Sequence, residues 1–222
     1  MGKNKHARFV ENHTFDCLFQ PSFQEVFRKD YRLKGSWNTD VFGRQAPICL
    51  ELGCGKGEYT LALAGKYPNR HFVGIDIKGA RLWRGAKTAT REAITNVAFV
   101  RTRIEFIDSL FAANEVDEIW ITFPDPQIEK ERKRLTHPMF LERYLKFLRP
   151  GATIRLKTDS RLLYDYTFGL ATTLGYPIHQ ADPDIYGSGL FRQIDILGVQ
   201  TFYEKQFLAQ GKPITYLAFT PN

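Results

Sequence analysis

Apolar and polar residues alternate in regular blocks from residue 48 onward. Short apolar runs that are typical of buried strands are separated by longer segments with helical periodicity. The expected strands cover residues 48–52, 71–75, 97–102, 118–122, 152–157 and 213–219. The expected helices cover about 57–67, 79–93, 136–148, 160–174 and 200–210. Strands that alternate with helices in this way predict βαβ units and a mostly parallel sheet with helices on both faces.

The remaining segments have less regular patterns. Residues 1–45 mix basic and aromatic residues without clear periodicity, and the first dozen read as disordered. Residues 181–198 are rich in Gly and Asp and are expected to form a loop. The pattern therefore predicts an N-terminal extension over residues 1–45 and one α/β domain over residues 46–222.

Composition narrows the classes of partner and compartment. Lys and Arg outnumber Asp and Glu by 31 to 24, a balance that favours a polyanionic partner without establishing one. No apolar run approaches the ~20 residues that span a bilayer, and no signal peptide is evident, so a cytoplasmic protein without a membrane partner is expected. The three cysteines form no CxxC pair and the five histidines are scattered, so neither a disulfide framework nor a metal site is expected.

The first expected strand is followed by a glycine-rich turn, Glu51–Gly57, which reads ELGCGKG. Glycines such as Gly53 let the backbone approach a ligand closely. A dinucleotide site would need G-x-G-x-x-G, but Glu58 occupies the position of its last glycine and would repel a pyrophosphate. Carboxylates suit a cationic ligand instead, and S-adenosylmethionine carries both a sulfonium and an ammonium group. The turn therefore predicts a site for S-adenosylmethionine.

The ends of the next two strands extend this interpretation. Asp76 ends the second strand, where its carboxylate can accept hydrogen bonds from both ribose hydroxyls of the cofactor. Arg103 follows the third strand, and backbone groups there could read the adenine edge. Solvation at the surface is an equally good explanation for the Arg103 side chain. A strand, glycine turn and helix also occur outside methyltransferases, but a second acidic feature at the matching spacing favours a methyltransferase.

A third feature, Phe123-Pro124-Asp125-Pro126, follows the fourth expected strand. Prolines on both sides of Asp125 restrict the backbone and would hold its side chain at the strand end, over the methyl group of the cofactor. A basic run comes next, at Lys130, Arg132, Lys133 and Arg134. Such a run alone usually marks a solvated face, but beside this turn it predicts contacts with phosphates.

Together these motifs resemble those of the bacterial tRNA (guanine-N7)-methyltransferases, over about residues 34–222. The similar segments are KGSWNTDVFG, ELGCGKG, GID, FPDP, KRLTHPMFLERY, LKTD and TFYEKQF. The resemblance implies a Rossmann-like class I methyltransferase fold with a mostly parallel, seven-stranded sheet. It also implies methylation of the guanosine at position 46 in the variable loop of tRNA.

Carried over by position, the resemblance assigns roles to individual residues. Cofactor contacts fall on Glu51, Gly53, Asp76 and Arg103, and the proposed catalytic residue is Asp125. Substrate contacts fall on Asp125, Asp159, Thr201, Phe202, Tyr203 and Glu204.

The loop after Asp125 departs from the common family pattern. It is about two residues shorter, and Gln127 replaces the usual tryptophan. Glu129 fills the literal spacing of the substrate-binding lysine, so Lys130 is taken as its counterpart.

The chemistry of the implied substrate agrees with these residues. Guanine N7 is an unprotonated acceptor, so its methylation needs no general base, and no histidine is placed to act as one. Asp125 and Asp159 could accept hydrogen bonds from the guanine N1–H and amino group, which adenine does not offer in the same pattern. Asp159 could also cap the helix expected over residues 160–174.

Several alternatives stay open from the sequence. The aromatic and basic residues of the N-terminal extension could clasp RNA or could simply pack and be solvated: Arg8, Phe9, Phe15, Arg28, Lys29 and Arg32. The helical face of Arg81, Arg84, Lys87 and Arg91 is typical of a solvated helix side. Two other functions also remain possible for the chain. One is a methyltransferase that acts on another RNA, a small molecule or a protein, and the other is a non-catalytic RNA-binding protein. No obligatory protein partner is evident.

Overall fold

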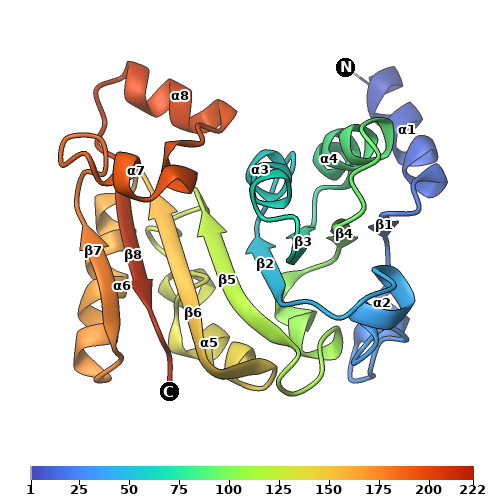
Figure 1. The fold of residues 1–222 in the computed structure, drawn as a ribbon, viewed down its shortest axis with the longest axis horizontal. Helices are drawn as coiled ribbons and strands as arrows, with labels where there is room; N and C mark the ends of the chain where they lie inside the picture. Colours follow the sequence, from blue (N-terminus) through green and yellow to red (C-terminus); the bar gives the residue numbers. More distant parts are fainter. Residues whose placement is uncertain (1) are drawn as a thin grey trace.

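The computed structural model describes the backbone of residues 2–222 and the side chains of residues 5–222. One eight-stranded sheet runs through the molecule in the order β1-β4-β3-β2-β5-β6-β8-β7 (Figure 1). Its strands are β1 (Leu18–Phe19), β2 (Ile48–Leu52), β3 (His71–Asp76), β4 (Val97–Arg101), β5 (Val116–Thr122), β6 (Leu148–Thr158), β7 (Ile178–Asp182) and β8 (Thr215–Phe219). The neighbours from β1 to β6 pair in parallel, and β8 runs antiparallel to β6 and β7. The predicted mostly parallel sheet is confirmed.

The order of the strands reverses between β2 and β5. The chain builds the sheet outward from β2 through β3 and β4, and then returns to add β5 on the other side of β2. Crossover connections leave a crevice at the carboxyl ends of the strands on either side of such a point, which is where α/β sheets bind ligands. The fold therefore directs attention to the residues that follow Leu52, Asp76, Arg101 and Thr122.

Helices cover both faces of the sheet, as predicted. They are α1 (Gly2–Glu11), α2 (Phe23–Val26), α3 (Glu58–Lys66), α4 (Gly79–Arg91), α5 (Pro138–Leu145), α6 (Arg161–Thr173), α7 (Leu190–Gln193) and α8 (Phe202–Ala209). Short helical turns add η1 (Asn12–Thr14), η2 (Trp37–Val41), η3 (Ile104–Ser109), η4 (Glu131–Lys133) and η5 (Asp195–Gly198). Among the described residues, no helix has the length and apolar character needed to cross a membrane.

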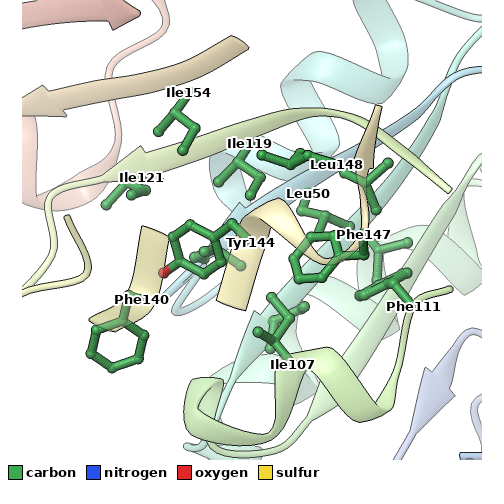
Figure 2. Close-up of a cluster of buried hydrophobic side chains, with 14 of the residues drawn as sticks. Leu50, Ile107, Phe111, Ile119, Ile121, Phe140, Tyr144, Phe147, Leu148 and Ile154 are labelled. Atoms are coloured by element: carbon green, nitrogen blue, oxygen red, sulfur yellow. The ribbon is translucent and has the colours of Figure 1, made fainter. Parts of the chain in front are cut away.

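Two apolar cores lie on opposite faces of the sheet. In one of them, Ile119 and Ile154 of the sheet face Phe140 and Tyr144 of α5 and Ile107 of η3 (Figure 2). The other core contains buried residues of α3, α4, α7 and η5. Burial of each large apolar side chain stabilises the fold by about 1.5–3 kcal/mol. The two cores together therefore hold the strands of the sheet in place.

The prediction of disorder over the first dozen residues is wrong for the part that the structure describes, and Met1 lies outside it. Residues 2–11 form α1, which packs on α4. The guanidinium of Arg8 lies 4.6 Å from the ring centroid of Trp83, and Glu11 accepts a 2.7 Å hydrogen bond from the Trp83 indole. These partners are about 70 residues away in sequence, so local patterning could not reveal them.

The edges of the sheet also differ from the prediction. The sheet has eight strands, whereas the apolar pattern predicts six and the resemblance implies seven. At one edge the additional strand is β1, which pairs with β4 through Leu18 and Phe99. At the other edge, β7 was not expected, since its side chains are mostly half-buried and show no apolar run. The expected loop 181–198 contains the end of β7 as well as α7 and η5. Short or half-exposed elements carry too weak a pattern to be predicted locally.

Candidate cofactor and substrate site

A large pocket opens at the carboxyl ends of β2, β3, β4 and β5. Its volume is about 520 Å³, which lies within the range of small-molecule sites. Its walls include four of the residues that the sequence singled out: Gly53, Asp76, Arg103 and Asp125. Four separate strand ends therefore meet at one cavity, as the topology requires.

The glycine turn after β2 forms one wall of this pocket. Gly53 has φ +75°, a conformation that residues with a Cβ rarely adopt. A Cβ added there would meet no heavy atom within 4 Å, so the backbone faces open space that a ligand can fill. At Gly57, by contrast, an added Cβ would lie 2.5 Å from the Phe99 ring, so glycine there permits close packing of the turn on the sheet.

Asp76 joins the glycine turn to the end of β3. One carboxylate oxygen accepts a 2.9 Å hydrogen bond from the Gly55 N–H, and the other accepts a 2.7 Å bond from the Lys78 N–H. Each oxygen retains lone pairs that can accept a further hydrogen bond from a ligand. Asp76 thus holds the turn in shape and also presents acceptors to the pocket.

Glu51 lies behind the glycine turn rather than in the large pocket. Its carboxylate accepts hydrogen bonds from the hydroxyls of Thr122 and Thr60. Burial raises the pKa of Glu51 to about 7, although both hydroxyl hydrogen bonds act in the opposite direction. Glu51 lines a second pocket of about 70 Å³, which shares Gly53 and Phe123 with the large one. The two pockets are therefore neighbouring parts of one site.

The FPDP turn after β5 has an unusual backbone. Phe123 (φ +47°) and Gln127 (φ +49°) both adopt the left-handed conformation on either side of Asp125. Such conformations cost on the order of 1–3 kcal/mol each and tend to occur at functional sites. The Phe123 N–H donates to the Lys157 carbonyl at 2.8 Å, and the Gln127 N–H donates to Asp125 at 3.1 Å. The turn thus presents an exposed Asp125 carboxylate at the pocket.

The end of β4 supplies the wall where adenine is expected. Thr102, Arg103, Ile104 and Glu105 all line the pocket. The Arg103 guanidinium pairs with the Glu105 carboxylate at 3.0 Å, and both side chains are exposed. Surface solvation and an ion pair thus account for the Arg103 side chain, while the backbone of this segment borders the pocket.

The beginning of α8 lies beyond the carboxyl ends of β5 and β6 (Figure 1). Thr201 caps α8 by accepting a 3.3 Å hydrogen bond from the Glu204 N–H. Phe202 and Tyr203 are exposed, and the Lys56 ammonium lies 4.2 Å from the centroid of the Phe202 ring. Thr201 and Tyr203 line the second pocket. This segment therefore borders the site from the side opposite to β4.

Glu204 faces the interior instead of the site. Its carboxylate is fully buried, forms a 2.8 Å ion pair with Lys157 and accepts a 2.8 Å hydrogen bond from the Tyr186 hydroxyl. Because it is buried and already paired, this carboxylate cannot contact a substrate directly in this arrangement. Glu204 instead fixes the position of its neighbours Phe202 and Tyr203.

Comparison with known proteins assigns the chain to a family. A methyltransferase family model, described as "Putative methyltransferase", matches residues 45–217. A curated tRNA (guanine-N(7)-)-methyltransferase from Christiangramia forsetii is 52% identical over 219 residues, which cover 98% of this chain and 97% of the relative. A second one, from Cytophaga hutchinsonii, is 39% identical and covers 99% and 98% of the two chains. The chain belongs to the tRNA (guanine-N(7)-)-methyltransferase family.

Solved structures agree with the predicted class I methyltransferase fold. The 16S rRNA methyltransferase KamB superposes with a TM-score of 0.61 at 15% identity, covering 82% of this chain and 91% of that one. The 16S rRNA (adenine(1408)-N(1))-methyltransferase from Catenulisporales acidiphilia gives 0.60 at 14% identity, covering 88% and 96%. At these identities the likeness shows the fold alone.

Asp159 of this methyltransferase does not cap a helix. Ser160 is the N-cap of α6, where its hydroxyl accepts a 3.3 Å hydrogen bond from the Leu163 N–H. The capping explanation for Asp159 is therefore wrong. Its partly buried carboxylate lies 3.7 Å from the Lys212 ammonium. Asp159 lines neither the large pocket nor the second pocket.

The basic run of the methyltransferase divides into different environments. Lys130 is exposed and lines a shallow hollow beside Asp125, whereas Lys133 lines the large pocket. Arg134 is buried, donates to the Pro126 carbonyl at 3.2 Å and lies 4.5 Å from the centroid of the Tyr166 ring. The expectation that Arg134 contacts phosphates is wrong, because its guanidinium supports the FPDP loop from within. Nothing in a run of like charges distinguishes a buried arginine from its exposed neighbours.

Proposed function

We propose that this chain transfers the methyl group of S-adenosylmethionine to N7 of a guanosine in tRNA, which gives 7-methylguanosine. The observation that carries the proposal is the 52% identity, over 98% of the chain, to a curated tRNA (guanine-N(7)-)-methyltransferase. The pocket supports it, because Asp76 and Asp125 reach one cavity from the ends of β3 and β5.

The residues around the pocket fit S-adenosylmethionine. The open space at Gly53 admits the ligand, and Asp76 would accept hydrogen bonds from the ribose hydroxyls. The carboxyl groups of Glu51 and Asp76 suit a cation, and the backbone from Thr102 to Ile104 would border the adenine. When bound, this cofactor supplies an electrophilic methyl group on a sulfonium.

The protein has little proton chemistry to perform in this reaction. Guanine N7 has a lone pair and no proton, so its bond to the methyl carbon forms while the carbon–sulfur bond breaks and no proton leaves. Positive charge moves to the purine, and the protein acts by positioning and by electrostatic stabilisation. Asp125 would accept hydrogen bonds from the guanine N1–H and amino group, with Asp159 as a second acceptor.

The aromatic and basic residues at the rim would hold the surrounding RNA. Phe202 and Tyr203 are exposed beside the second pocket, where aromatic rings can stack on bases. Thr201 and Glu204 would act by holding these two rings, and Lys130 would reach the RNA from the FPDP loop.

We further propose that the target is position 46 in the variable loop, that the enzyme acts in the cytoplasm, and that it needs no obligatory protein partner. In this proposal residues 46–222 are the catalytic domain and residues 1–45 an extension that supports it.

The direct test is methyl transfer from labelled S-adenosylmethionine to an unmodified tRNA transcript, followed by digestion and identification of the labelled nucleoside. The proposal predicts label in 7-methylguanosine. Label in another nucleoside, or no incorporation into tRNA, would show that the substrate has been misassigned.

Replacing Asp76 with alanine should weaken S-adenosylmethionine binding by about 1–3 kcal/mol, the scale for removal of a charged hydrogen bond. The weakening combines the missing ribose contacts with a loosened glycine turn, since Asp76 also binds the Gly55 N–H. Calorimetry measures the affinity, and Asp165→Ala on α6 is the control, because Asp165 is an exposed carboxylate paired with Arg161. Equal affinity of wild type and Asp76→Ala would remove Asp76 from the site.

Replacing Lys130 and Lys133 together with alanine should weaken tRNA binding and flatten its dependence on salt. The slope of log affinity against log salt should fall by about one unit for each phosphate that the variant no longer binds. The control is Arg44→Ala with Lys66→Ala, which removes the same charge from two exposed residues, one before β2 and one at the end of α3. A salt slope equal to that of the wild type would show that Lys130 and Lys133 do not contact phosphates and are simply solvated.

A further inference from the structure

The N-terminal extension places exposed aromatic rings beside the large pocket. Phe23 and Phe27 stack with ring centroids 4.6 Å apart, and Phe106 meets Phe23 edge to face at 5.6 Å. Phe23 is 59% exposed and Phe27 is 43% exposed. We call Phe23, Phe27 and Phe106 the aromatic shelf. Single exposed aromatic residues are ordinary, but a stacked exposed pair next to a pocket is typical of a binding surface.

Hydrogen bonds and burial hold the aromatic shelf on the domain. A capping box between Ser22 and Glu25 stabilises the amino end of α2, and Val26 inserts into the core. The Val26 carbonyl accepts a 2.7 Å hydrogen bond from the Ser109 hydroxyl, which ties α2 to η3. Because Phe106 also belongs to η3 and packs partly against the core, it connects the exposed rings of Phe23 and Phe27 to the body of the domain.

The aromatic shelf and the large pocket share a wall. A hollow of about 250 Å³ is lined by Phe23 and Phe106 together with Ile77, Thr102 and Arg103. The last three residues also line the large pocket. A group on the aromatic shelf would therefore be a near neighbour of whatever occupies the large pocket.

Arginines surround the aromatic shelf. The Arg28 guanidinium lies 5.2 Å from the centroid of the Phe27 ring, and Arg101 and Arg103 line the adjoining hollow. Of the nearby carboxylates, Glu25 accepts hydrogen bonds from Ser22, and Glu105 pairs with Arg103. Guanidinium groups beside exposed rings match the combination of phosphate and base in single-stranded RNA.

We propose that the aromatic shelf stacks an unpaired nucleobase of the tRNA beside the β4 side of the large pocket, with Arg28 facing its phosphates. This inference rests on the proposed function and adds a second RNA contact to it. The exposed rings, the arginines beside them and the continuity with the large pocket together favour RNA over a protein partner. The extension would then clasp RNA through α2, whereas Phe15 is buried in the core and Arg8 stacks on Trp83.

The test compares tRNA binding by wild type and by the double variant Phe23→Ala, Phe27→Ala. The double variant should bind tRNA about tenfold more weakly, as expected when one base no longer stacks, with unchanged melting temperature and S-adenosylmethionine affinity. Phe168→Ala is the control, because Phe168 is 40% exposed on α6, which packs near the opposite edge of the sheet. As a second readout, Phe23→Trp should retain affinity, and its added fluorescence should be quenched when tRNA binds.

Three outcomes would overturn the inference while leaving the proposed function intact. One is wild-type tRNA affinity in the double variant, with no quenching in Phe23→Trp. Another is weaker S-adenosylmethionine binding by the double variant, which would assign the rings to the cofactor pocket. The third is a wild-type dimer that the double variant dissociates while it still binds tRNA normally. Failure of the proposed function is distinguishable, because the wild type itself would then not methylate tRNA.

Discussion

Replacing Asp125 with asparagine should lower the rate of tRNA methylation about 100-fold or more, with little change in S-adenosylmethionine affinity. Asparagine keeps the shape of the FPDP turn but lacks the charge and one acceptor. Removal of one well-placed electrostatic group from an active site commonly costs ~10²–10³ in turnover. Single-turnover measurements with saturating cofactor and tRNA give the rate of the chemical step.

The control for Asp125→Asn is Glu129→Gln, which removes a charge four residues away in the same exposed loop. This control should retain nearly full turnover. Since N7 carries no proton, the wild-type rate on bound tRNA should show no break near neutral pH that reflects deprotonation of the nucleophile. Wild-type turnover in Asp125→Asn would contradict the role assigned to this carboxylate.

Replacing Lys157 with methionine should lower the free energy of unfolding by about 3–5 kcal/mol, the usual cost of breaking a buried ion pair. The variant leaves the Glu204 carboxylate buried without its partner. It also removes hydrogen bonds from the Lys157 ammonium to the carbonyls of Leu197 and Val199, at 2.7 and 3.0 Å. Urea denaturation measures the change in stability.

The double variant Lys157→Met, Glu204→Gln should recover part of that stability, because no unpaired buried charge remains. An exposed pair, Lys66 with Asp195, provides the comparison, and Lys66→Met should cost less than about 1 kcal/mol. A similarly small cost, below about 1 kcal/mol, in Lys157→Met would show that the buried pair does not hold α8 on the sheet.

The sheet and the pocket could be predicted from the sequence because their signals are local. The apolar run of β2 and the glycines that follow it mark a strand and a turn without knowledge of any partner. The rule that ligands bind at the carboxyl ends of parallel strands then brings Asp76 and Asp125 to one place. The structure agrees, since both residues line the same pocket.

The features that could not be predicted depend on contacts between distant segments. Residues 2–11 become helical against Trp83, and β1 exists because two residues pair with β4. The burial of Arg134 and Glu204 follows from Tyr166 and Lys157, which the local sequence does not indicate. The sequence marks Lys133 only as one member of the basic run, although it is the lysine of that run that lines the large pocket.

In the proposed function the methyl group is attached to N7 of guanosine 46. The most direct test uses two tRNA transcripts that differ at this nucleotide alone, one with guanosine and one with 7-deazaguanosine, in which a C–H group replaces N7. We expect methylation of the first transcript and no incorporation into the second, while both bind the enzyme with similar affinity. Equal methylation of the two transcripts would contradict the assignment to N7 of guanosine 46.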